Sequence, residues 1–485
     1  MSKATSHLVR GLTRRHIRFI ALGSAIGTGL FYGSAGAIKT AGPSVILAYL
    51  IGGAAIFIVM RALGEMAVEH PTSASFGSYA GRYLNPGIGF VTGWVYVIDL
   101  LIVVLADLTA VGIYMGFWFP DVPRWIWVLS VIILIGLINL LHVKVFGELE
   151  FWLAAIKITA ILAMIAGGII LLMTGFSGSS PALLWNQGGF FPNGFSGFTA
   201  AFVLVLFGFG GIEIIGITAA EAENPEKNIP MAINSVPMRV LLFYVGSLTV
   251  LMALRPWHTI GEEGSPFVMI FEHLGIGIAA AVLNVVVLSA AISAINADIF
   301  ATGRMAYGLA SEGQGPKVLT RCTRHGVPYL TALVMTGAML LAVVLNALVP
   351  EQLFEIFASL VVFVTLWVWV SILLSHWSMR RRREKAGVGP GRFAQPLFPI
   401  STIVVLAFFA YVIVTLALNP TYQIAFIVGL VTFAILGVAY LLWSRRHPEA
   451  RRYYEEEAEL PSTVPVTDHH PGPDEPEIDD AERER

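Results

Sequence analysis

The chain has 485 residues, of which 56% are apolar and 13% are charged, and its mean hydropathy is +0.75. Charged residues make up about a quarter of a typical soluble domain, so 30 basic and 32 acidic side chains cannot cover soluble domains of this total length. The composition therefore predicts an all-α integral membrane protein. The formal net charge of −2 argues against a nucleic-acid-binding protein, and a single cysteine excludes an intramolecular disulfide framework.

A membrane-spanning helix needs about 20 predominantly apolar residues. Twelve segments meet this requirement, at 17–39, 43–65, 88–117, 125–142, 150–174, 196–222, 236–255, 275–303, 328–349, 353–378, 397–418 and 421–443. The basic N-terminus leads into a long apolar run, which is unlike a cleaved signal peptide. We therefore expect a cytoplasmic segment at 1–16, a transmembrane domain at 17–443 and a tail at 444–485, whose prolines and acidic residues predict disorder.

The positions of the lysines and arginines predict the orientation. With the N-terminus in the cytoplasm, nearly all of them fall on the inner side of the membrane, including the run from Arg380 to Lys385 after the tenth span. We expect a multi-pass protein of the plasma membrane with both termini in the cytoplasm. The longer connections are predicted inside at 66–87 and outside at 175–195.

Two predicted spans carry a glycine cluster near mid-membrane: Gly23 to Gly29 in the first, and Gly208 to Gly211 in the sixth. Either cluster alone favours close packing of helices, which small residues permit. Together they favour two unwound points, because these spans are corresponding members of two five-helix halves, about 17–174 and 196–378, with extra helices at about 397–443. A broken helix offers N–H groups to an anion and carbonyls to a cation, so a zwitterionic amino acid would satisfy both.

Ionisable residues inside a membrane are costly and usually functional. Lys157 lies about eight residues into the fifth span, where it could exchange a proton during transport or extend its long stem toward the lipid headgroups. Glu213 lies beside the second glycine cluster, where it could bond freed backbone groups or face the substrate path. Asp107 and Asp99 are deep in the third span, and their spacing does not decide which of them faces the path.

The sequence contains no phosphate-binding loop of an ATPase and no protease or esterase motif. The histidine pair in the acidic tail is a poor metal site. We therefore expect no enzyme activity, no cofactor and no metal, and transport that an ion gradient drives, with protons as the ion that Lys157 suggests. The expected partners are a small amino acid, protons and the lipid bilayer, with no nucleic acid.

Two motifs carry a family resemblance. They are Ile26-Gly27-Thr28-Gly29-Leu30-Phe31, and Gly210-Gly211-Ile212-Glu213 continuing to the segment 221–230. The chain resembles the amino acid permeases of the amino acid–polyamine–organocation (APC) superfamily, specifically the bacterial amino acid transporter (AAT) branch. The segments 112–120, 143–148 and 234–239 look most like the proline-specific permeases, and histidine permeases are close relatives.

The resemblance implies a LeuT-like fold, with ten core helices in two inverted repeats, helices 1 and 6 broken, and two helices outside. It assigns the substrate carboxylate to Gly27, Thr28 and Gly29. Carbonyls near Ala25, Phe207 and Gly210 would take the α-amino group, and Phe207 would close over the substrate as a gate. The remaining substrate-binding candidates are Ile26, Phe209, Asp107 and Ser359.

Lys157 falls where proton-coupled members of the branch carry a lysine, and Glu213 is the second candidate for proton coupling. Asp107 is shorter than the glutamate that the resemblance leads us to expect, which could reshape the side-chain pocket. The leading hypothesis is a symporter that imports proline with a proton. The alternatives are a histidine or aromatic amino acid permease, an amino acid exchanger, and an amino acid sensor that signals through its tail.

Overall fold

The computed structural model describes residues 26–72, 74–139, 143–218, 224–260, 264–323, 328–348 and 353–448. The predicted N-terminal segment 1–16 and the predicted tail beyond residue 448 lie outside these residues. Within the described residues every regular element is a helix, as the composition predicts.

The longer helices form the body of the molecule. They are α3 (Val45–Glu69), α5 (Pro86–Gly116), α6 (Arg124–Asn139), α7 (Val143–Thr174), α16 (Gly277–Ser311), α17 (Tyr329–Leu348), α18 (Leu353–Lys385), α19 (Ile400–Leu418) and α20 (Gln423–Arg446). The shorter helices are α2 (Ser34–Ala41), α4 (Ser75–Tyr83), α8 (Leu183–Asn186), α9 (Gly194–Ala200), α10 (Phe202–Phe207), α11 (Ile214–Thr218), α12 (Pro225–Asn234), α13 (Val236–Arg239), α14 (Ser247–Leu254) and α15 (Pro266–His273). Two π-helical turns, Gly29–Gly33 and Val240–Gly246, continue into α2 and α14.

Nine helical stretches of the described chain are long and apolar enough to cross a membrane, and two shorter apolar helices, Arg124–Leu137 and Gly194–Phe207, accompany them. The first of the nine, Gly29–Glu69, contains parts of two predicted spans. They meet at Gly42, where a φ of +62° interrupts the helix with a backbone conformation that suits glycine. The described residues thus form a multi-span helical protein, and the count of twelve spans stays a prediction.

The predicted inner connection at 66–87 is wrong as a simple loop, because α4 forms inside it and is buried along its whole length. Glycines bring its backbone against α5: a Cβ added at Gly89 would lie 2.6 Å from the Cα of Gly81. Small residues therefore supply the part of α4 that meets α5, while Phe76, Tyr79 and Tyr83 are buried as well. A helix of nine residues is too short to be found by a search for spans of about 20 residues.

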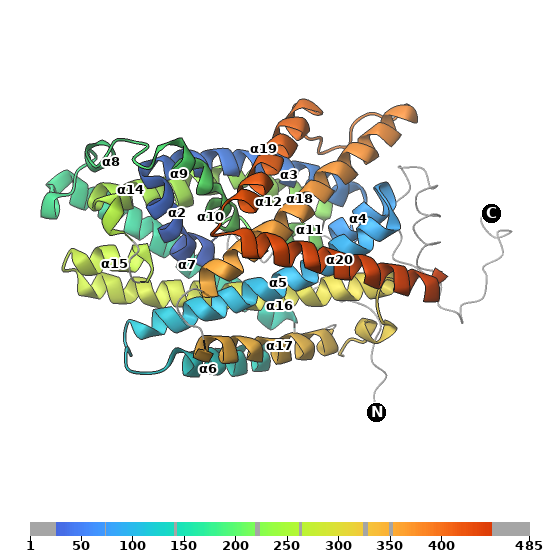
Figure 1. Cartoon of the computed structure of the whole chain (residues 1–485), viewed down its shortest axis with the longest axis horizontal. Coiled ribbons are helices and arrows are strands. Elements are labelled where there is room, and N and C mark those ends of the chain that lie inside the picture. Colours follow the sequence, from blue (N-terminus) through green and yellow to red (C-terminus); the bar gives the residue numbers. More distant parts are fainter. Residues whose placement is uncertain are drawn as a thin grey trace.

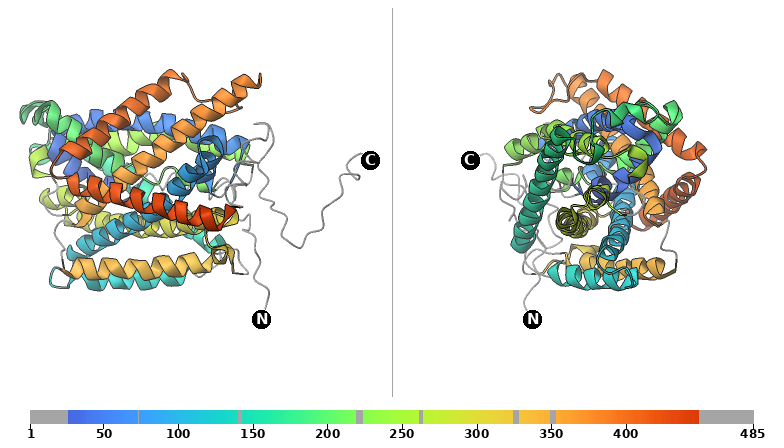
Figure 2. Two further views of the ribbon diagram at one scale, coloured as in Figure 1. Left: turned by 45° about the vertical axis from the view of Figure 1, so that its right-hand side comes forward. Right: turned by 90° about the vertical axis from the view of Figure 1, so that its left-hand side faces the viewer.

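The helices α5 and α16 run beside each other through the middle of the molecule, and α6 and α17 lie together along one flank (Figure 1). The turned view in Figure 2 keeps α6 beside α17 and α20 along the outside. On α20, large apolar side chains such as Ile427 and Leu441 are more than half exposed, at 58% and 56%. This exposure suits a surface that faces lipid.

The start of α5 is set by its local sequence. Pro86 occupies the first helical turn, and the side chain of Asn85 accepts a hydrogen bond from the backbone N–H of Gly87 at 2.8 Å. This cap fixes the register of the helix that carries both Asp99 and Asp107. The two aspartates are eight residues apart, so they lie on nearly the same face, about 12 Å apart along the axis.

Candidate substrate site

The predicted break in the sixth span is present. α10 ends at Phe207, α11 begins at Ile214, and turns join them. Gly211 has a φ of +86° in this segment, which favours glycine. The freed backbone groups find partners: the hydroxyl of Tyr244 donates to the carbonyl of Gly208 at 2.5 Å, and the N–H of Gly211 donates to the carboxylate of Glu213 at 3.1 Å.

The first glycine cluster lies directly opposite. In the described part of the chain, the first helix begins at Thr28 in this cluster. The N–H groups of Leu30 and Phe31 both donate to the carbonyl of Gly27 at 3.2 Å. The preceding N–H groups of such a helix start have no partner within the helix, which makes them available to an anion. Ala25 and the earlier glycine lie outside the described residues.

The two glycine clusters are in contact. A Cβ at Gly29 would lie 2.6 Å from the Cα of Gly208 and 3.3 Å from the carbonyl oxygen of Phe207. The second cluster therefore serves both predicted purposes: it interrupts its helix and allows close packing. The first cluster shows the close packing and the start of a helix.

A cavity of about 60 Å³ lies beside this contact. The predicted site residues that line it are Gly27, Thr28, Gly29, Asp107, Lys157, Phe207, Gly210 and Glu213. The volume leaves room for only a few water molecules. A bound amino acid would require this contracted cavity to widen.

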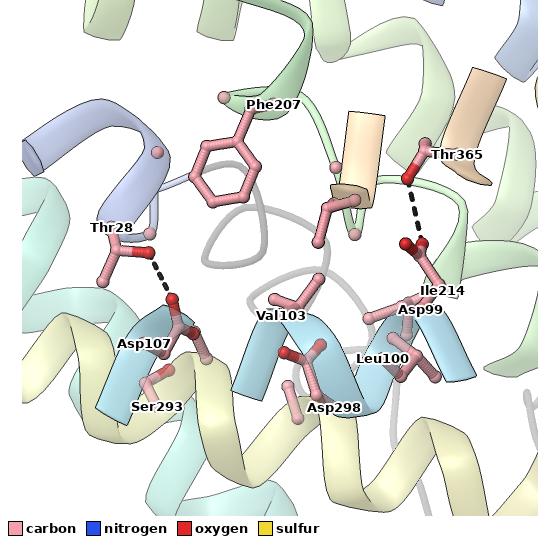
Figure 3. Close-up of a pocket in the computed structure, with 18 of the residues that line it drawn as sticks. Thr28, Asp99, Leu100, Val103, Asp107, Phe207, Ile214, Ser293, Asp298 and Thr365 are labelled. Atoms are coloured by element: carbon pink, nitrogen blue, oxygen red, sulfur yellow. Dashed lines mark hydrogen bonds between the residues drawn. The ribbon is translucent and has the colours of Figure 1, made fainter. Parts of the chain in front are cut away.

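At one end of the cavity the hydroxyl of Thr28 donates a hydrogen bond to the carboxylate of Asp107, and the ring of Phe207 lies over the same region (Figure 3). Phe207 packs edge-on against Phe354, with ring centroids 5.5 Å apart, and Phe354 packs against Tyr32 at 4.6 Å. Phe354 and Tyr32 line a second and larger cavity of about 620 Å³. The ring of Phe207 is thus placed between the two cavities, where the predicted gate would act.

Lys157 points into the protein core. Its side chain is 1% exposed, and its Nζ donates to the hydroxyl of Ser293 at 2.9 Å. The carboxylate of Glu150 lies 3.9 Å from Nζ and accepts a hydrogen bond from the same Ser293 at 2.5 Å. This network excludes the alternative in which the lysine extends to the headgroups.

Glu213 braces the broken helix. Besides the N–H of Gly211, its carboxylate accepts hydrogen bonds from the hydroxyl of Tyr96 at 3.0 Å and from the indole N–H of Trp369 at 3.2 Å. The sequence suggested that Glu213 could bond freed backbone groups or face the substrate path. Its side chain does bond a freed backbone N–H, and it also lines the cavity.

Several polar residues of the cavity were missed or left undecided from the sequence. Both Asp99 and Asp107 line it, together with Glu150, Ser293 and Asp298. Glu150 lies seven residues before Lys157, hence on the same helix face, which is a signal that could have been read. An aspartate inside an apolar span, as at Asp298, is another.

Three predicted site residues do not line the cavity. Ile26 is fully buried in the core, and the ring of Phe209 packs against Tyr49 and Tyr244. The hydroxyl of Ser359 donates to the carbonyl of Ile356 within its own helix, at 2.9 Å. The cavity geometry gives these three predictions no support.

Comparison with known proteins identifies the family of the chain. Residues 16–451 match the family described as amino acid permease. The chain belongs to the amino acid permease family. It is 45% identical over 444 residues to the uncharacterized amino acid permease YtnA of Bacillus subtilis (strain 168), covering 91% of this chain and 96% of the relative. It is also 45% identical over 436 residues to the aromatic amino acid transport protein AroP of Escherichia coli (strain K12), covering 90% of this chain and 95% of the relative.

The family is one of transporters, so the protein is an amino acid permease of a membrane with an amino acid as its substrate. The relatives give no support to the predicted likeness to proline-specific permeases. They leave proton coupling and the individual substrate open.

Proposed function

We propose that this amino acid permease imports its substrate together with protons, by alternating access to the cavity beside Gly29 and Gly208. The observation that carries the proposal is the buried ammonium of Lys157 in the wall of this cavity, hydrogen-bonded to Ser293 and close to Glu150. Burial disfavours the charged form of a lysine and a nearby carboxylate favours it, so Lys157 and Glu150 are placed to load and release a proton. Loading and release of a proton can thus depend on which side of the membrane the cavity faces.

The substrate's main chain is proposed to bind across the two helix breaks. The N–H groups at Gly27, Thr28 and Gly29 would take the carboxylate, and the carbonyls of Phe207 and Gly210 would take the ammonium. Gly29 lies close to the carbonyl oxygen of Phe207, and this closeness supports the arrangement. The N–H groups that would bind the substrate carboxylate and the carbonyl that would bind its ammonium are then within reach of one amino acid.

The finer architecture belongs to the same proposal. It comprises twelve spans with both termini in the cytoplasm, two inverted five-helix repeats, and Phe207 as the gate. The contacts between Phe207, Phe354 and the larger cavity support the gate. Among the substrates predicted from the sequence, the name of AroP favours aromatic amino acids over proline.

The test is uptake of radiolabelled amino acids into proteoliposomes that contain the purified full chain, with and without an inward proton gradient. We expect the gradient to raise uptake, and Lys157→Ala to abolish that increase. Lys317→Ala, which removes an exposed lysine, is the matched control and should behave as the wild type.

Uptake that ignores the gradient but requires amino acid inside the vesicles would instead make the protein an exchanger. A wild type that moves none of the twenty amino acids in either format would contradict the transport proposal itself.

A further inference from the structure

The cavity holds more carboxyl groups than the proposed function uses. Among the described side chains that line it, five are acidic, namely Asp99, Asp107, Glu150, Glu213 and Asp298, and Lys157 is the one cation. Glu150 is compensated by Lys157, Asp107 accepts from Thr28, and Glu213 has three donors. Asp99, Asp107, Glu150 and Asp298 each keep one carboxylate oxygen without a hydrogen-bond partner. Of these four, Asp107 is bonded to Thr28 and Glu150 faces Lys157, which leaves Asp99 and Asp298 for a donor from the substrate.

Both of these aspartates are buried and incompletely bonded. Asp99 is 1% exposed and Asp298 is 4% exposed. Thr365 donates to one oxygen of Asp99 at 2.9 Å, while the other oxygen, Oδ1, has no hydrogen-bond partner. Oδ2 of Asp298 has none either. Buried acceptors without donors cost free energy, so these oxygens are placed to receive a donor from a ligand.

Their position in the cavity fits a side-chain subsite. Figure 3 shows Thr28 and Asp107 at one end, Asp99 and Thr365 at the other, and Asp298 below Val103 on the neighbouring helix. The two ends are about 12 Å apart along α5, at 1.5 Å per residue. An extended lysine or arginine spans such a separation when it makes a hydrogen bond at each end.

Beside the polar side chains already named, five aliphatic residues line the cavity, namely Leu100, Val103, Ile214, Ala297 and Val361. Aliphatic residues next to carboxylates suit a substrate side chain that has a methylene stem and a cationic head. A purely aliphatic or aromatic side chain would leave the unbonded oxygens of Asp99 and Asp298 buried without a donor. A metal ion is a poorer match, because within the described chain no three acidic, histidine or cysteine side chains are arranged to hold one.

We propose that Asp99 and Asp298 form a side-chain subsite for basic amino acids, those with an amine, guanidinium or imidazole group. This inference rests on the proposed transport function and specifies its substrate class. Charge-assisted hydrogen bonds from the cationic head to the two carboxylates would provide the selectivity, because such bonds are roughly twice as strong as neutral ones.

The test compares uptake of lysine, arginine and histidine with uptake of phenylalanine and proline, in proteoliposomes with the full chain. The variants are Asp99→Asn and Asp298→Asn, which keep the side-chain shape, and the exposed loop residue Asp121 provides the control Asp121→Asn. We expect the wild type to prefer a basic amino acid. We expect each cavity variant to lower the ratio of basic to neutral uptake at least tenfold, mainly through KM, while the control keeps the ratio.

A second readout does not depend on the variants. In detergent, a basic amino acid should raise the melting temperature of the wild-type protein more than phenylalanine or proline does. Equal or smaller stabilisation by all basic amino acids would overturn the inference.

Two transport outcomes would also overturn it. One is a wild type that carries neutral amino acids and is not inhibited by lysine, arginine or histidine, which leaves the proposed transport function intact. The other is a pair of variants that keep their selectivity but lose the response to the proton gradient, which would assign the two aspartates to proton transfer. Absence of transport for every amino acid would count against the proposed function instead.

Discussion

At the scale of single residues, the helix break depends on groups that replace lost backbone hydrogen bonds. Glu213 is the clearest case, since it is 1% exposed and accepts from a backbone N–H, a tyrosine hydroxyl and an indole N–H. All three partners are donors, so the position requires a side chain with acceptors only. The residue is therefore a structural brace as well as a candidate for proton coupling.

We expect Glu213→Gln to lower the stability of the protein by about 2 kcal/mol, because the amide places a donor against donors and the hydrogen bonds lose their charge assistance. The measurement is thermal unfolding of the purified protein in detergent. Glu272→Gln removes an exposed carboxylate and is the control. Tyr96→Phe removes one donor only and should cost less. An unchanged melting temperature for Glu213→Gln would show that the hydrogen bonds of Glu213 do not contribute to stability.

At the scale of elements, the site depends on the contact between the start of the first helix and the break after α10. The Cβ of any other residue at Gly29 would lie 2.6 Å from backbone at Gly208, a distance that a flexible side chain could relieve but a main chain cannot. The two broken elements must separate to accept the extra methyl group.

We therefore expect Gly29→Ala to reduce amino acid uptake at least tenfold and to lower the melting temperature, since overpacking costs about 1–3 kcal/mol. Gly337→Ala is the matched control, because Gly337 is in the exposed face of α17 and its Cβ would meet nothing within 4 Å. Normal uptake by Gly29→Ala would mean that the contact between the two elements is loose in the membrane.

The sequence predicts the elements better than their contacts. The break at Gly208 to Gly211 was predictable because glycine clusters at corresponding places carry a local signal. The meeting of Ser293 and Asp298 of α16 with Glu150 of α7 was not, since only the folded chain brings these two helices together. Ser359 stays a prediction: it does not line this cavity, and its helix face is set by packing that no spacing rule in a uniformly apolar span reveals.

At the scale of the whole molecule, one buried carboxylate joins segments from opposite ends of the chain. Glu65 of α3 is completely buried and lies 2.8 Å from the imidazole of His376 and 3.0 Å from the guanidinium of Arg380, both on α18. It also accepts from the backbone N–H groups of Gly391 and Gln395, at 3.0 and 2.9 Å, in the connection that follows α18. α3 and α18 are thus held together at one end of the helix bundle.

Glu69 offers a natural comparison one turn further along α3. Its carboxylate lies 3.2 Å from Arg383 of α18, but its side chain is 20% exposed. Removing one partner of a buried ion pair typically costs 3–5 kcal/mol, because the other partner remains buried without its counter-charge. A more exposed pair contributes about 0–1 kcal/mol.

We therefore expect Glu65→Ala to destabilise the protein by at least about 3 kcal/mol and Glu69→Ala by about 1 kcal/mol, measured by thermal unfolding in detergent. Adding His376→Ala to Glu65→Ala should cost less than the sum of the two single changes, because the partners share one network. Equal losses for the Glu65 and Glu69 variants would contradict the central role of Glu65. Additive losses in the double variant would show that Glu65 holds α3 and α18 together without His376.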